Sequence, residues 1–221
     1  MNEKIKDLLS KLTLEEKAGL CSGKDFWRTK SVERLGIPSV MVSDGPSGLR
    51  TQNENGVDEN DSRTAVSFPS GCATASSFDR DLMRKLGEIL GEEANNFGLS
   101  TVLGPAINIK RSPLCGRNFE YFSEDPYVSG ELGSAYIQGV QSKNVGTSLK
   151  HFAANNQETN RFSVSEEVDE RTLREIYLAG FETCVKKSQP TTIMCSYNAI
   201  NGELSSQNKW LLKDLLRDQW G

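Results

Sequence analysis

Residues 145–155 read VGTSLKHFAAN, an apolar run that ends in a lysine, a histidine and further polar side chains. Three other runs share this character, namely IPSVMVSD (37–44), LSTVLGPAINI (99–109) and PTTIMCSYNAI (190–200). Strands that are covered on both faces of a parallel sheet read as near-continuous apolar runs of this kind. The sequence therefore predicts four strands over these ranges.

Each apolar run is followed, after a polar loop, by a segment with helical periodicity. Leu82, Leu86 and Leu90 recur at four-residue spacing, as on the buried face of an amphipathic helix. The predicted helices span about 79–97, 126–142, 168–187 and 207–220. Strand–loop–helix units in series indicate a parallel sheet with helices outside it.

The number of units predicts an open sheet. Four units account for the 221 residues at roughly 55 each, and a closed eight-stranded barrel at that spacing needs about twice the length. The expected fold class is α/β, the first half of a TIM-like (β/α)8 barrel with about four parallel strand–helix units. Open strand edges and an uncovered apolar interior would leave it incomplete. We therefore expect a second polypeptide carrying the rest of the fold, or self-association.

The N-terminal segment, 1–36, is predicted to be helical, and the four units occupy 37–221. Thr13 and Glu16 fit a capping box, in which the threonine oxygen accepts a backbone N–H of the first helical turn. This box is expected to divide the first 20 residues into two helices.

Composition excludes several classes of protein. Lys and Arg number 26 against 30 Asp and Glu, and without a basic run this balance argues against nucleic-acid or anionic-membrane binding. No apolar stretch is long enough to span a membrane, and the charged N-terminus does not resemble a secretory signal. Five irregularly spaced cysteines favour free thiols and a cytoplasmic location. A single histidine and no CxxC argue against a zinc site, and no cofactor is expected.

Polar side chains gather where the predicted strands end, which is where chemistry sits in such folds. Asp44 could accept sugar hydroxyls, act as a nucleophile, or only cap a turn. Arg117 could bind hydroxyls or belong to a structural salt-bridge cluster. His151, beside Lys150, could bind a ligand or be a satisfied buried imidazole. In the fourth run, Tyr197 and Met194 could wall a pocket, although core packing is favoured for Met194. This mixture suits a polyol or sugar ring and carries no metal site.

Several blocks together resemble the N-terminal region of bacterial β-glucosidases of glycoside hydrolase family 3. They are RLGIPSVMVSDGPSGLR (34–50), GRNFEYFSEDP (116–126) and KHFAANNQETNR (150–161). The resemblance implies a barrel-like domain that binds the non-reducing-end glucose, followed by an α/β sandwich.

The resemblance also implies roles for six residues. Asp44 would grip the outer hydroxyls of the sugar, and the other hydroxyls would be bound by Arg117, Lys150 and His151. Tyr197 would lie beside the reacting carbon, with Met194 on the same wall.

The catalytic pair of the family is expected beyond Gly221. Its nucleophile is an Asp in a Ser-Asp-Trp-type motif and its acid/base is a Glu of the following domain, and retaining hydrolysis needs both. The implied activity is therefore retaining hydrolysis of terminal non-reducing β-D-glucosyl residues, with little turnover from this chain alone. The alternatives are a non-catalytic or engineered half-barrel that self-associates or only binds sugar, a β-xylosidase, and a self-sufficient hydrolase with Asp44 and Glu120 as its carboxylate pair.

Overall fold

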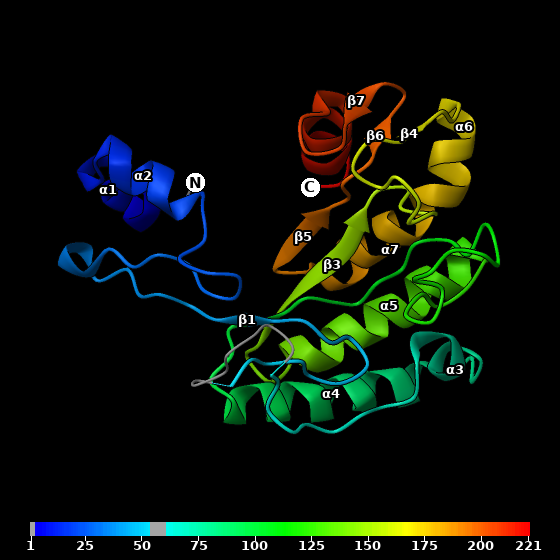
Figure 1. Cartoon of the computed structure of the whole chain (residues 1–221), viewed down its shortest axis with the longest axis horizontal. Helices are drawn as coiled ribbons and strands as arrows, with labels where there is room; N and C mark the ends of the chain where they lie inside the picture. Colours follow the sequence, from blue (N-terminus) through cyan, green and yellow to red (C-terminus); the bar gives the residue numbers. More distant parts are fainter. Residues whose placement is uncertain (1–2, 54–60) are drawn as a thin grey trace.

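A computed structural model describes residues 3–53 and 61–221, and it contains a four-stranded parallel sheet (Figure 1). The strand order is β1-β2-β3-β5, and every neighbouring pair is parallel. The strands are β1 (Val42–Ser43), β2 (Thr101–Val102), β3 (Gly146–Phe152) and β5 (Thr192–Cys195). Among the described residues this sheet does not close, because β1 and β5 stand at its two ends. The α/β, half-barrel prediction is confirmed.

The predicted strands 37–44 and 99–109 are too long. Residues 37–41 turn back and form antiparallel bridges, Arg28 with Met41 and Val32 with Ile37, and so do not extend β1. After β2 the chain passes through Gly104–Pro105, where proline has no N–H for a ladder bond. The later part of the run rejoins β3 through a single parallel bridge, Ala106 with Lys150.

Two predicted helices agree with the structure to within a residue or so. They are α4 (Arg80–Asn96) and α5 (Pro126–Gln141). Each begins after an aspartate whose carboxylate accepts two backbone N–H groups, Asp79 for α4 and Asp125 for α5.

Helices α4 and α5 lie side by side (Figure 1) and approach closely at glycine. A Cβ on Gly139 would stand 2.1 Å from the carbonyl oxygen of Arg84, so only glycine fits there.

The last two predicted helices form, but with different hydrogen bonding. The segment 168–187 divides into α6 (Glu170–Thr172), a π-helical turn η2 (Leu173–Tyr177) and α7 (Ala179–Ser188). The segment 207–220 contains a π-helix, η3 (Trp210–Gln219). Apolar residues three and four positions apart occur in both α-helices and π-helices. The sequence pattern therefore predicted a helix here but not its type of hydrogen bonding.

A second, small sheet was not predicted. It has the order β4-β6-β7, formed by β4 (Ser165–Glu166), β6 (Ala199–Ile200) and β7 (Glu203–Leu204). The predicted strand 190–200 is therefore two strands, β5 and β6. Asn201 and Gly202, both with positive φ, make the tight turn between β6 and β7.

The remaining elements are short or lie near the N-terminus. They are α1 (Glu3–Lys11), α2 (Leu14–Leu20), η1 (Glu33–Leu35) and α3 (Gly71–Ala75). The capping box of Thr13 and Glu16 is confirmed, and it separates α1 from α2 as predicted. Residues 1–2 of the predicted helical segment lie outside the described residues. Figure 1 shows α1 and α2 standing away from the sheet. No helix in the described part of the chain has the length and apolar character needed to cross a membrane.

Side chains of β3 pack in the apolar core and hold the strand in place. Leu149 and Phe152 are fully buried. The ring of Phe152 makes edge-to-face contacts with Phe181 at 5.2 Å and with Trp220 at 5.9 Å between centroids. This packing holds the carboxyl end of β3, where Lys150 and His151 lie.

Candidate sugar-binding site

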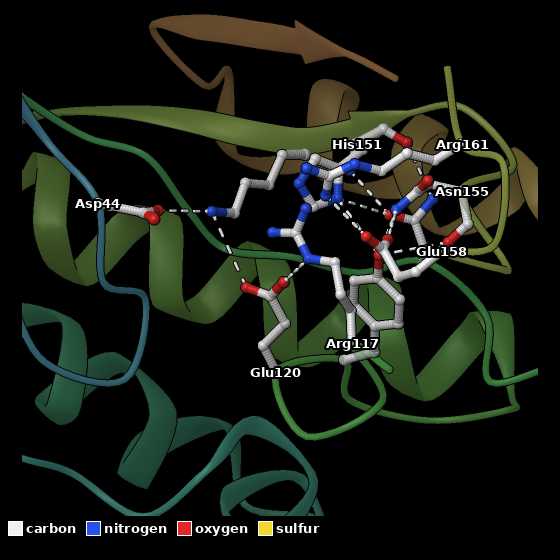
Figure 2. A network of polar contacts seen from close by, with 10 residues as sticks. Asp44, Arg117, Glu120, His151, Asn155, Glu158 and Arg161 are labelled. Carbon is white, nitrogen blue, oxygen red and sulfur yellow. Dashed lines mark hydrogen bonds and ion pairs between the residues drawn. The ribbon is translucent and has the colours of Figure 1, made fainter. Parts of the chain in front are cut away.

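The end of β3 is irregular. Lys150 pairs with Met194 and Phe152 with Cys195, so His151 is an extra residue against β5. Such a bulge changes the direction of a side chain that would otherwise point to the opposite face. His151 thus lies among the polar side chains of the network in Figure 2, and the charge of the adjacent Lys150 acts on its ring.

Charges of opposite sign alternate through the centre of this network. The Nζ atom of Lys150 lies 2.9 Å from Oδ1 of Asp44 and 3.9 Å from Oε2 of Glu120. The other oxygen of Glu120 accepts from Nε of Arg117 (Figure 2). Lys150 is 2% exposed and Glu120 5%, so each buried charge has its partner inside the protein.

The carboxylate of Asp44 is ionised and partly exposed to solvent. Burial opposes its charge, but the Lys150 ammonium, its hydrogen bond and the backbone N–H of Gly45 outweigh burial and lower the pKa of this carboxyl. Its side chain keeps 36% exposure. Asp44 can therefore accept hydrogen bonds from a ligand, whereas a general acid needs a raised pKa. The alternative of Asp44 and Glu120 as a catalytic pair is not supported, since both carboxylates are committed to cations.

Arg117 is a fixed cation at the rim of the network. Burial alone would lower its pKa, but the charge and hydrogen bond of Glu120 raise it. Its half-buried guanidinium thus has remaining N–H groups available to hydroxyl oxygens.

His151 is a buried, neutral imidazole. Its backbone N–H donates to Oδ1 of Asn108 at 2.8 Å, and its Nδ1 lies 3.4 Å from the hydroxyl of Tyr121. Burial, followed by the charges of Arg117, Lys150 and Arg161, lowers the pKa of His151 to about 2.

This neutral state makes stability depend on pH. The pKa of His151 falls from its ordinary 6.5 to about 2 on folding, so between these values only the unfolded chain binds the proton. We expect the free energy of unfolding to decrease as the pH falls below about 6.5, by at most about 1.4 kcal/mol per pH unit. Urea denaturation at about pH 7.5 and about pH 5 measures the decrease.

The control for this prediction is His151→Gln, which removes the only imidazole of the chain. Burial raises the pKa of Glu166, which stabilises the fold as the pH falls and so acts in the opposite direction. The decrease should therefore be smaller in His151→Gln than in the unaltered chain. An equal decrease in both would show that His151 does not cause it.

Asn155, Glu158 and Arg161 also belong to the network and were not singled out in the sequence. Arg161 donates to Glu158 at 2.7 Å, and Glu158 accepts from Nδ2 of Asn155 at 3.0 Å (Figure 2). All three lie in KHFAANNQETNR, which the sequence analysis used only as a block. The signal was present as two opposite charges, three residues apart, directly after the third strand.

The aromatic edge of the site is joined to the network through Arg161. Its guanidinium lies 5.3 Å from the ring centroid of Tyr197, and Tyr197 packs on Phe162 at 4.7 Å. Tyr197 is 55% exposed, so its ring is accessible to a ligand. Met194 is half-buried beside Lys150 in the ladder, a position compatible with lining the site or with packing.

The structure thus brings Asp44, Arg117, Lys150 and His151 into one cluster, with Tyr197 at its edge. It presents an open carboxylate acceptor, cationic donors, a neutral imidazole and an exposed aromatic ring. Hydroxyl groups both donate and accept, so this alternation suits a polyhydroxylated ring better than a purely anionic or apolar ligand.

Comparisons with known proteins agree with this chemistry. The model of the glycosyl hydrolase family 3 N-terminal domain matches residues 9–221. The chain is 59% identical over 218 residues to thermostable β-glucosidase B of Acetivibrio thermocellus, and 53% identical over 224 residues to an exo-α-(1→6)-L-arabinopyranosidase of Bifidobacterium longum. These matches cover 98% and 100% of the chain, but 29% and 30% of the relatives.

A solved structure of β-glucosidase 3B from Thermotoga neapolitana in complex with α-D-glucose has a TM-score of 0.93 and 47% identity. The match covers 99% of this chain and 32% of that one. The chain therefore spans less than a third of the length of these relatives. Since the family model covers nearly all of its residues, the chain belongs to glycosyl hydrolase family 3 and matches the family's N-terminal domain.

Proposed function

We propose that this chain provides the glucose-binding subsite of a retaining β-glucosidase that hydrolyses terminal non-reducing β-D-glucosyl residues. The observation that carries the proposal is the alternating network in which Lys150 joins the partly open carboxylate of Asp44 to Glu120 and Arg117. Relatives named β-glucosidase, one of them solved with glucose, support it.

Each residue then has a role that its chemistry allows. Asp44 accepts from the outer hydroxyls of glucose, and Lys150 and Arg117 donate to its oxygens. The exposed ring of Tyr197 stacks near the reacting carbon, with Met194 on the same wall.

Two further residues complete the subsite. His151 binds another hydroxyl of the sugar. Arg161, fixed by Glu158 and by the Tyr197 ring, adds a third cation.

The nucleophile and the acid/base of the hydrolysis are proposed to lie outside these 221 residues. Retaining hydrolysis needs two carboxyl groups about 5–5.5 Å apart, one nucleophilic and one able to donate a proton. Asp44 and Glu120 are both held as ion-paired acceptors. The partner of this chain is then the polypeptide that carries the nucleophile and acid/base, with self-association of a sugar-binding half-barrel as the alternative.

A pentosidase is the second candidate, because one relative at 53% identity is an arabinopyranosidase. A pentopyranose lacks the outer CH₂OH of glucose, so it loses contacts near Asp44. The β-xylosidase alternative predicts the same loss.

Hydrolysis of three nitrophenyl glycosides tests these proposals, using an active polypeptide that contains this chain. We expect kcat/KM to be highest for the β-D-glucopyranoside, and lower for the α-L-arabinopyranoside and β-D-xylopyranoside. A preference for either pentoside would replace the proposed specificity, and hydrolysis of none would refute the activity.

A bacterial source and a cytoplasmic location are also proposed. All five cysteines lie within the described residues and are free thiols, as expected in a reducing compartment. Bacterial relatives support the source.

Intact mass spectrometry of the purified active protein would show whether the partner is a second chain.

A further inference from the structure

The side chain of Asn108 is clamped to the backbone of His151. Its Oδ1 accepts the His151 N–H at 2.8 Å, and its Nδ2 donates to the His151 carbonyl at 2.9 Å. Both residues are buried. Because one backbone group is a donor and the other an acceptor, only one orientation of the amide satisfies both.

The same amide oxygen faces the imidazole. Oδ1 of Asn108 lies 3.3 Å from Nδ1 of His151. An amide oxygen can only accept, so this contact is favourable when Nδ1 carries the proton. With the proton on Nε2, two lone pairs would face each other in the interior.

Tyr121 does not need the opposite tautomer. Its hydroxyl accepts from Nδ2 of Asn155 at 2.8 Å, and that amide is oriented by the carboxylate of Glu158 at 3.0 Å. The proton of the Tyr121 hydroxyl reaches the backbone oxygen of Asn155 at 3.3 Å. A proton on Nδ1 of His151 therefore leaves every one of these contacts satisfied.

We propose that Asn108 is a positioning residue that keeps the proton of His151 on Nδ1 and so presents Nε2 as a hydrogen-bond acceptor for a sugar hydroxyl. Within residues 3–53 and 61–221, Nε2 makes no hydrogen bond and is not among the buried polar atoms without a partner. Nε2 is thus accessible to a ligand. The identity of that ligand rests on the proposed function, whereas the tautomer does not.

This assignment gives His151 a distinct part in recognition. The charged groups that act on the ring are Arg117, Lys150 and Arg161, all cations that can only donate. They favour the neutral ring. A neutral Nε2 acceptor requires the ligand to donate, and a hydroxyl does this while its oxygen accepts from a neighbouring cation.

Nuclear magnetic resonance tests the tautomer directly, because His151 is the one histidine of these 221 residues and its signals are those that disappear in His151→Gln. Two-bond ¹H–¹⁵N correlation spectra of an active, ¹⁵N-histidine-labelled polypeptide that contains this chain distinguish Nδ1–H from Nε2–H. We expect Nδ1–H, unchanged between about pH 5 and pH 8. A proton on Nε2, or titration near the ordinary pKa of histidine, would overturn the proposal.

Variants separate positioning from a general structural role. Asn108→Asp keeps an acceptor opposite Nδ1, so we expect Nδ1–H to persist and the pKa of His151 to rise beside the new carboxylate. Asn108→Leu removes the acceptor and should move the proton to Nε2, with Nδ1 accepting from Tyr121. If Asn108→Leu does not fold, Asn108→Asp decides alone, and loss of Nδ1–H there contradicts the proposal.

The matched control is Asn208→Leu. Asn208 is also buried and also bonds a backbone group, the N–H of Leu211, but it belongs to the start of η3. The tautomer of His151 should not change in this variant. A change as large as in Asn108→Leu would mean that any loss of a buried amide disturbs the ring, which overturns the specific role of Asn108.

Binding of sugars tests the acceptor role separately. Titration calorimetry of an active polypeptide that contains this chain, with glucose and its monodeoxyfluoro analogues, should find one position, in addition to the hydroxyls that donate to Asp44, where fluorine, which cannot donate, weakens binding by about tenfold. The same loss should be absent in His151→Ala. Equal binding of all analogues contradicts the acceptor role. If glucose itself does not bind, the proposed function fails while the spectra still decide the tautomer.

Discussion

Asp44→Ala is expected to lower kcat/KM for a β-D-glucoside by on the order of 100-fold or more, in an active polypeptide that contains this chain. The carboxylate is ionised, partly open, and able to accept from two hydroxyls. A hydrogen bond to a charged group contributes about 1.5–3 kcal/mol, so two of them account for an effect of this size. Steady-state kinetics with a nitrophenyl β-D-glucopyranoside measures it.

The change at Asp44 also affects Lys150. Without the carboxylate, the anionic partner left to the buried ammonium among residues 3–53 and 61–221 is Glu120, at 3.9 Å. Asp44→Asn, which retains an acceptor oxygen but not the charge, should give a smaller loss than Asp44→Ala.

Asp81→Ala serves as the matched control, because Asp81 lies in the first turn of α4 and is exposed. Its kcat/KM should stay close to that of the unaltered protein. If Asp44→Ala behaves like Asp81→Ala, Asp44 does not hold the sugar.

The second large effect is expected on stability. Glu120→Ala should lower the free energy of unfolding by about 3–5 kcal/mol, the cost of removing one partner from a buried ion pair. Glu120 is 5% exposed and lies between Arg117 and Lys150, so its removal takes the carboxylate partner from the half-buried guanidinium of Arg117 and one anionic neighbour from the buried Lys150. Urea denaturation at neutral pH measures the change.

The chain offers a close control for Glu120. Glu131 is also a buried carboxylate between two cations, but these cations, Arg80 and Lys187, are 65% and 52% exposed. Water can solvate them after Glu131→Ala, so we expect a loss nearer the 0–1 kcal/mol of surface pairs. If both variants lose the same stability, burial of the cationic partners of Glu120 does not determine its contribution.

The repeated strand and helix pattern could be predicted because it depends on local features. Apolar runs located the sheet, and the caps at Asp79 and Asp125 begin helices within a residue of their predicted starts. Strand lengths could not be predicted in this way. The length of a strand depends on which segments pair with each other. Residues 37–41, for example, pair with the preceding loop and so do not extend β1.

The site was predictable where charge follows an apolar run, as at Asp44 and Lys150. It was not predictable where a polar residue acts through geometry. Asn108 stands inside LSTVLGPAINI and reads as part of a strand, yet the irregular backbone after Pro105 places its amide on His151. Glu120 likewise had no signal that separated an ion-pair partner from a catalytic acid.

The measurement that tests the central claim most directly is a structure of an active polypeptide containing this chain with glucose bound. The account predicts that hydroxyls of glucose lie within hydrogen-bond distance of Asp44, Lys150 and His151, and that no carboxylate of residues 1–221 reaches the anomeric carbon. Glucose bound elsewhere, or Asp44 or Glu120 against that carbon, would contradict it.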